Sequence, residues 1–115
     1  MMTTININGT EHTLKFGIKA LAELDTKYSI PVEGGFTLPM GLQTAVTHLQ
    51  LGNVTAIANL IQAGTGLREA QVAKFLEADD TDMDVVFEVI TEALEEGNLT
   101  KKFMGQLKDQ VEAQK

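Results

Sequence analysis

Cysteine is absent from this 115-residue chain, there are only two prolines, and no long apolar run occurs. The absence of cysteine excludes disulfide bonds, zinc–thiolate sites and thiol catalysis, and it fits an intracellular protein. A membrane-spanning helix needs roughly 18 consecutive apolar residues, and no segment approaches that length. The N-terminus also lacks the basic and then apolar layout of a secretion signal. We therefore expect neither export nor membrane insertion.

Positive charge is scarce relative to negative charge. Nine Lys and Arg stand against 16 Asp and Glu, which gives a formal net charge of −7. This balance argues against a duplex-binding protein, because neutralising phosphates requires clustered Lys and Arg. The stretch from Glu77 to Glu96 is rich in acids and contains no Lys or Arg. It predicts either a solvated acidic face, which we favour, or an electrostatic surface for a basic partner.

A metal site is not expected from the acidic stretch. The three acids that alternate from Asp80 to Asp84 resemble the start of an EF-hand calcium loop. However, Val85 stands where the loop requires Gly, and Thr91 stands where it requires a bidentate Glu. Acids at the start of a helix explain this pattern more simply.

Other motifs for chemistry are incomplete. Gly64-Thr-Gly66 lacks the Gly-Lys-Ser/Thr of a phosphate-binding loop, and a connection between two helices explains both glycines. His12 and His48 are the only histidines and do not pair at ligand spacing, so we interpret them as surface or rim residues. Ser29, the only serine, is not in a nucleophile elbow. We expect no catalytic, cofactor-binding or metal-binding residues, and no enzyme.

Asp25 is the one acid with an ambiguous position. It falls within the arc set by Ile18, Leu21 and Tyr28, so it is either a partly buried acid with a shifted pKa or an exposed acid near a helix end. We favour the exposed position.

The N-terminal residues predict a β-hairpin followed directly by a helix. Residues 4–7 and 10–16 read as strands on either side of Asn8-Gly9, the strongest short-range hairpin signal. The helix is predicted over residues 17–28. Alternation gives the hairpin one apolar face, made by Ile5, Ile7, Leu14 and Phe16. A lone hairpin is marginal in water, so we expect this face to pack on the helix that follows.

Downstream, both prolines and a Gly-Gly pair fall between Ser29 and Pro39, which predicts a loop. Five helical stretches follow, marked by Leu42–Leu49, Val54–Ile61, Val72–Leu76, Met83–Leu94 and Phe103–Val111. We expect Gly52, Gly64 and Gly97 to end helices, and Asn53 and either Thr81 or Asp82 to cap them. Arg68 stands where a good cap would be expected.

These segments predict a mainly α fold of the α+β class, an N-terminal β-hairpin followed by a bundle of five to six short helices. We expect one domain over residues 1–115. Residues 1–16 would form the hairpin and residues 17–98 the helical core. Residues 99–115 would form a C-terminal helix, either mobile or partner-binding.

The segment from Thr4 to Asp25 resembles the opening of the tail assembly chaperones of long-tailed, non-contractile phages and prophages of Gram-positive bacteria. That opening is a strand, an Asn-Gly turn, an aromatic-ended strand and a helix with an Ala-Leu-x-Glu-Leu core. Three further segments resemble the middle and acidic helices of the family: Leu51–Gly64, Glu69–Leu76 and Asp84–Ile90. Arg68 and the loop from Glu33 to Gly35 depart from the usual pattern.

The resemblance implies a non-enzymatic role in tail assembly. Such chaperones bind the tape-measure protein, keep it soluble and recruit tail-tube subunits. They work in the cytoplasm of the host and are usually absent from the mature virion. In many such phages a ribosomal frameshift yields a second, extended form, which would be a further partner. No cofactor, nucleic acid or membrane is implied.

Four residues are our candidates for a client-contacting or self-contacting surface: Phe103, Met104, Leu107 and Val111. The alternative is that they dock on the core of the domain itself. Self-association by repeated contacts around a client is a second hypothesis. Two other functions stay open, a virion structural subunit (a tail or head-completion protein) and a small acidic regulator or DNA mimic.

Overall fold

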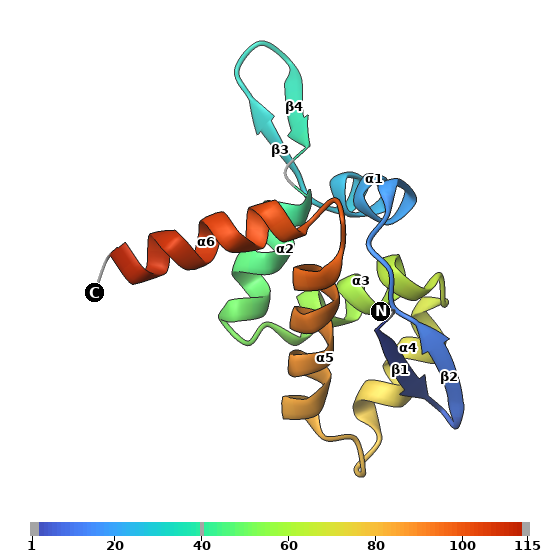
Figure 1. Cartoon of the computed structure of the whole chain (residues 1–115). Coiled ribbons are helices and arrows are strands. Elements are labelled where there is room, and N and C mark those ends of the chain that lie inside the picture. The colour runs from blue at the N-terminus through green and yellow to red at the C-terminus, as the bar shows by residue number, and fades with distance from the viewer. Residues whose placement is uncertain (1–2, 40, 114–115) are drawn as a thin grey trace.

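The computed structural model describes residues 3–39 and 41–113, and it describes side chains over residues 3–28, 33–35 and 41–109. Within these residues the chain forms two antiparallel hairpins and six helices (Figure 1), which confirms the mainly α fold of the α+β class. The elements are β1 (Thr4–Ile7), β2 (Thr10–Thr13), α1 (Ile18–Lys27), β3 (Ser29–Val32), β4 (Phe36–Pro39), α2 (Gly41–Gln50), α3 (Val54–Thr65), α4 (Glu69–Glu77), α5 (Met83–Glu96) and α6 (Lys101–Ala113).

The first hairpin forms as its turn residues predict. Asn8 and Gly9 both have positive φ, 53° and 86°, as a two-residue turn of type I′ requires. The ladder pairs Ile7 with Thr10 and Thr4 with Thr13. The second strand ends at Thr13, whereas the predicted strand ended at Phe16. The predicted apolar face is nevertheless confirmed, since all four of its members are buried: Ile5, Ile7, Leu14 and Phe16.

The hairpin face packs against a helical core. Leu24 of α1, Leu60 of α3 and Leu94 of α5 are each fully buried, and they join the hairpin residues in one hydrophobic cluster. Polar contacts tie the helices together around this cluster. The Asn59 amide nitrogen donates a hydrogen bond to the Tyr28 hydroxyl at 2.8 Å. The ring centroids of Tyr28 and His48 lie 5.9 Å apart, and the two rings pack edge to face. Three helices are thereby joined at one end of α1.

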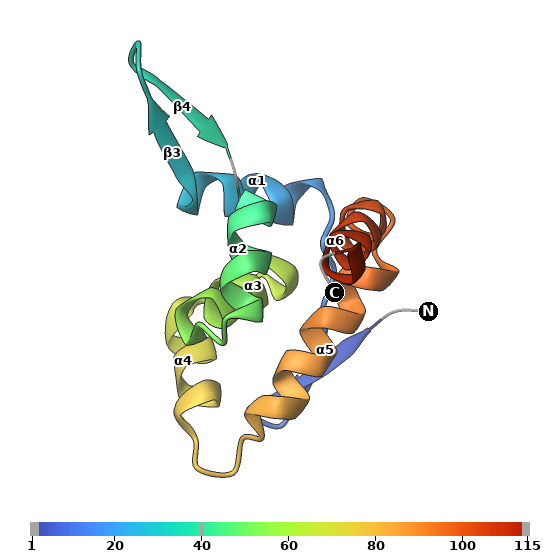
Figure 2. The ribbon, with the colours of Figure 1, turned by 90° about the vertical axis from the view of Figure 1, so that its left-hand side faces the viewer.

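The prediction of a loop between Ser29 and Pro39 is wrong, because β3 and β4 form a second hairpin there. Gly34 and Gly35 both have positive φ and form its turn. Both strands of an isolated hairpin are edge strands, where the missing N–H of a proline is tolerated. Figures 1 and 2 show this hairpin projecting from the helices. The projection fits a Cα radius of gyration of 14.5 Å, against roughly 13 Å for a compact chain of this length.

The prediction that Gly64 ends a helix is also wrong. The helix α3 continues to Thr65, and Gly66, with φ of 80°, forms its left-handed C-cap. Gly64 is buried instead, and a β-carbon there would overlap the side chain of Leu14 and press on Phe16. Its carbonyl accepts a hydrogen bond from the Lys15 N–H at 2.9 Å. Glycine at this position therefore lets the first hairpin approach α3 closely.

Helix capping follows the predicted residues at two sites. The Asn53 side chain accepts from the Ala56 N–H at 2.8 Å, and Asp82 accepts from the Asp84 N–H at 3.0 Å. A guanidinium group carries only hydrogen-bond donors, so the Arg68 side chain cannot cap the N-terminus of α4. The Gln71 side chain reaches back and accepts from the Arg68 N–H at 3.1 Å.

The favoured exposed position for Asp25 is wrong, since its side chain is half-buried. A carboxylate oxygen of Asp25 accepts a hydrogen bond from the Gly41 N–H at 2.8 Å, at the first residue of α2. A β-carbon on Gly41 would overlap the backbone of Leu24 and Asp25. The carboxylate therefore caps α2 across a close contact between two helices, where the helix dipole favours negative charge.

Candidate interaction surface

The corner between α5 and α6 sets the direction of the last helix. Thr100 is fully buried in this corner. Its hydroxyl donates a hydrogen bond to the Leu94 carbonyl at 2.5 Å, and the Gly97 carbonyl oxygen lies 3.4 Å from the same hydroxyl oxygen. The Lys101 N–H continues the connection by donating to the Gly97 carbonyl at 2.9 Å. These bonds satisfy carbonyls at the end of α5 that the helix itself leaves unpaired. From the corner, α6 extends away from α5 (Figure 1).

The predicted contact residues of α6 lie along its inner side. Phe103, Met104 and Leu107 are half-buried and pack against the hydrophobic core. Val111 belongs to α6, but its side chain lies outside the described residues. These three side chains pack on the core and still expose part of their surface. They can therefore dock on the core and contact a partner at the same time.

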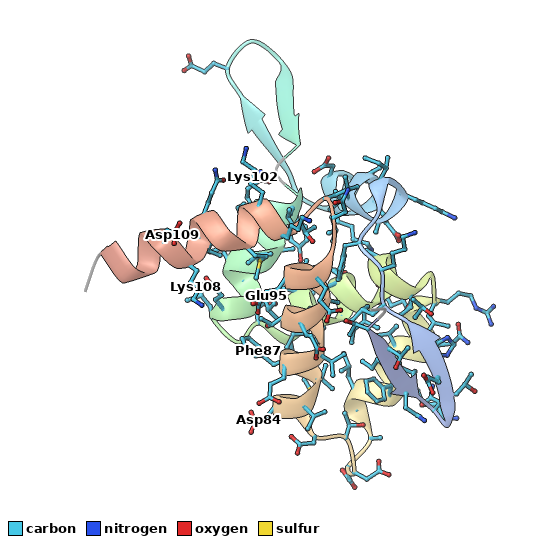
Figure 3. All side chains as sticks on the ribbon, viewed as in Figure 1. Asp84, Phe87, Glu95, Lys102, Lys108 and Asp109 are labelled. Atoms are coloured by element: carbon cyan, nitrogen blue, oxygen red, sulfur yellow. The ribbon has the colours of Figure 1, made fainter. Side chains whose placement is uncertain are left out.

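A hollow lies between α5 and α6, and we call it the α5–α6 hollow. It consists of two adjacent depressions that share Thr91 and Glu95. One depression follows α5 and is lined by Phe87, Glu88, Thr91, Glu92, Glu95 and Glu96. The other reaches α6 and α2 and is lined by Gln50, Thr91, Glu95, Met104, Leu107 and Lys108. Figure 3 shows Phe87, Glu95 and Lys108 on the side where α6 leaves α5.

The walls of the α5–α6 hollow combine apolar and acidic groups. Phe87, Met104 and Leu107 are half-buried and supply the apolar part. The glutamates that line it are exposed on α5, whose described helix carries no basic residue. Among the lining residues, Lys108 alone is basic. Such a surface fits a ligand that offers apolar side chains flanked by positive charge.

Thr91, on the side of α5 that lines the hollow, has a hydroxyl without a hydrogen-bond partner among the described residues. Its hydroxyl oxygen is buried. An unsatisfied buried hydroxyl costs roughly 1–3 kcal/mol. It lies where the two depressions meet. Packing within the described part of the chain therefore leaves this hydroxyl unsatisfied where the two depressions meet.

The residues considered for metal binding do not gather. His12 lies on β2, whereas His48 lies on α2 against Tyr28. Asp82 is engaged in capping α5. Among residues 3–28, 33–35 and 41–109, whose side chains the structure describes, no cluster of three His, Asp or Glu side chains is arranged to hold a metal ion. The helices within residues 3–39 and 41–113 include none with the length and apolarity of a membrane span.

Of the four contact residues predicted on α6, Met104 and Leu107 line the hollow and Phe103 does not. The acidic stretch was predicted as a separate feature. The structure brings Met104 and Leu107 beside Glu95 and adds Gln50 from α2. Periodicity could have placed Thr91 and Glu95 on one side of the acidic helix, since they are four residues apart. Nothing in the sequence signals Gln50, which joins the site only through tertiary packing.

The comparisons with known proteins define the family. The model of a family described as phage tail assembly chaperone protein, TAC, matches residues 4–108. The match covers nearly all of the chain, and the chain belongs to this family. The protein is therefore a phage tail assembly chaperone by family. Searches of curated proteins and of solved structures found no match.

Proposed function

We propose that this chain binds the tape-measure protein of its phage, keeps that protein soluble and recruits tail-tube subunits to it. The family match over residues 4–108 is the observation that carries this proposal. The proposal adds the partners, which are those implied by the resemblance to chaperones of long-tailed, non-contractile phages of Gram-positive bacteria. The role is non-catalytic and is carried out in the cytoplasm of the host, without incorporation into the mature virion.

The α5–α6 hollow is our candidate for the tape-measure site. A tape-measure protein is a long helical chain, and an amphipathic helix laid in a groove presents apolar side chains at helical spacing. Phe87, Met104 and Leu107 would receive those side chains. The glutamates of α5 would attract Lys or Arg at the edges of the client helix and speed its association. A net charge of −7 also favours solubility of the complex.

Co-expression with the tape-measure protein from the same phage genome tests the proposal. We expect the soluble fraction of the tape-measure protein to rise when this chain is present. An unchanged soluble fraction would contradict the proposed function. Mass spectrometry of purified particles separates the chaperone from a virion structural subunit, because the chaperone should be missing from the particle.

Self-association around the client is the second part of the proposal. Repeated heterologous contacts would let several copies cover one long client. Sedimentation velocity over a wide concentration range tests it, and we expect the mean mass to increase with concentration. A monomer mass at every concentration would contradict it. A frameshift-extended form of the chain, where the genome encodes one, would be a further partner.

A further inference from the structure

The strand β1 has an open edge whose backbone groups lack partners. The Leu14 N–H donates to the Thr3 carbonyl at 2.9 Å, and hydrogen-bonded pairs alternate along an antiparallel ladder. The registered pairs Ile5–His12 and Ile7–Thr10 are therefore the hydrogen-bonded ones. The N–H and C=O groups of Thr4 and Asn6 face away from β2. No hydrogen bond to these groups occurs within the described residues.

This open edge borders a groove. The groove holds about 530 Å³ and lies between β1, the end of α4 and the first turns of α5. Ile5, Thr4 and Asn6 line it on one side, and Val85, Val89 and Phe75 line it on the other. Val85 is 51% exposed, although it is a large apolar residue. The groove thus offers backbone hydrogen-bonding groups on one wall and apolar side chains on the opposite wall.

The charge around the groove selects its occupant. Asp80 and Asp82 lie at one end, and none of the residues that line the groove is basic. A second copy that paired here through its own β1 would bring no Lys or Arg to this end, since Thr4–Ile7 contains neither. A third strand with Lys or Arg near that end would be attracted. Its side chains on the same face as Ile5 would point toward Val85 and Val89.

We propose that this groove binds an extended, basic segment of a partner protein, which adds to β1 as a third strand. No residue lines both the groove and the α5–α6 hollow, so this site is additional to the proposed tape-measure site. Alternating apolar residues give the segment its contacts with α5, and terminal Lys or Arg residues give it contacts with Asp80 and Asp82.

Amide hydrogen exchange of the full chain tests the proposal with a synthetic probe, the peptide Lys-Val-Thr-Val-Thr-Val-Lys. In the free protein we expect fast exchange at the N–H groups of Thr4 and Asn6 and slow exchange at those of Ile5 and Ile7. Peptide at ten times its Kd should slow exchange at Thr4 and Asn6 by about tenfold. The same peptide with glutamate at both ends should bind at least about tenfold more weakly. A tenfold change in Kd is about the effect of a single close charge contact.

Two matched variants locate the binding. Val85→Lys replaces an apolar residue of the groove wall by one with the same charge as the lysines of the peptide. We expect it to weaken binding of the basic peptide by about tenfold or more. Val54→Lys is the control, because Val54 is 55% exposed, also lies in the first turn of a helix and does not line the groove. It should leave the Kd unchanged.

Three results would overturn the proposal. The first is peptide binding that leaves exchange at Thr4 and Asn6 unchanged. The second is equal binding of the basic and acidic peptides. The third is slow exchange at both residues in the free protein that depends on protein concentration, because a second copy would then cover the edge.

Discussion

The two hairpins of this molecule are both antiparallel pairs of four-residue strands, but they have different surroundings. Both turns contain residues with positive φ, Asn8 and Gly9 in the first and Gly34 and Gly35 in the second. The first hairpin buries Ile5 and Ile7 in the core. The second projects from the helices (Figure 2). A turn therefore determines that a hairpin forms, whereas its apolar face determines whether the hairpin becomes part of the core.

The first test removes the apolar face of the docked hairpin. Ile7 is only 2% exposed, so Ile7→Ala leaves a cavity in the core. We expect a loss of about 2–5 kcal/mol in the free energy of unfolding, measured by urea titration. A loss below about 1 kcal/mol would show that the hairpin contributes little to the core.

The second test separates the docked hairpin from its helix. Gly64→Ala places a β-carbon against Leu14 and Phe16. Overpacking of this kind costs about 1–3 kcal/mol, and thermal unfolding should show a lower Tm. Gly105→Ala is the control. A β-carbon at Gly105 meets no atom within 4 Å, and Ala in a helix stabilises by roughly 0.5–1 kcal/mol relative to Gly. Equal effects of the two substitutions would contradict the close approach of hairpin and helix.

The third test compares the turns directly. Gly9 and Gly35 have φ of 86° and 82°, and a β-carbon meets no atom within 4 Å at either position. The backbone strain from Ala should therefore be about 1–2 kcal/mol at both. We expect Gly9→Ala to lower global stability by about that amount, because its hairpin unfolds with the core. Gly35→Ala should lower it by under about 0.5 kcal/mol, because the projecting hairpin opens locally. Equal losses would indicate that both hairpins unfold with the core.

The fourth test removes the projecting hairpin. We expect a variant with residues 30–38 replaced by Gly-Gly-Ser to unfold within about 1 kcal/mol of the natural chain, since few contacts with the helices are lost. Urea titration of the two proteins side by side measures the difference. A variant that no longer unfolds cooperatively would show instead that the second hairpin supports the core.

Local signals were sufficient for much of the fold. The Asn8-Gly9 turn and the Asn53 cap depend on neighbouring residues, so the sequence predicted them correctly, and it narrowed the cap of α5 to Thr81 or Asp82. Gly64 was misread, because its role is a tertiary contact with Leu14 that no neighbouring residue signals. The second hairpin was missed for a different reason. Prolines normally argue against strands, but both of its strands are edges.

In the candidate site, too, the local features could be predicted from the sequence and the tertiary contacts could not. The apolar spacing of α6 and the acidic stretch of α5 were visible in the sequence. Their meeting in one hollow depends on the corner at Thr100, where a buried hydroxyl holds the end of α5. Asp25 was likewise assigned to solvent, because its partner, the Gly41 N–H, lies 16 residues further along the chain. Long-range hydrogen bonds of this kind leave no periodic signal.

Co-purification with a tagged tape-measure protein tests the central claim most directly, through a matched pair of charge reversals. Glu95 lines the α5–α6 hollow, whereas Glu77 does not, and both are exposed glutamates in the last turn of a helix. We expect Glu95→Arg to reduce the amount of chain recovered with the tape-measure protein by about tenfold or more, which is the loss of one favourable charge contact and the gain of an unfavourable one. Glu77→Arg should be recovered like the natural chain. Equal recovery of both variants would contradict binding at the α5–α6 hollow.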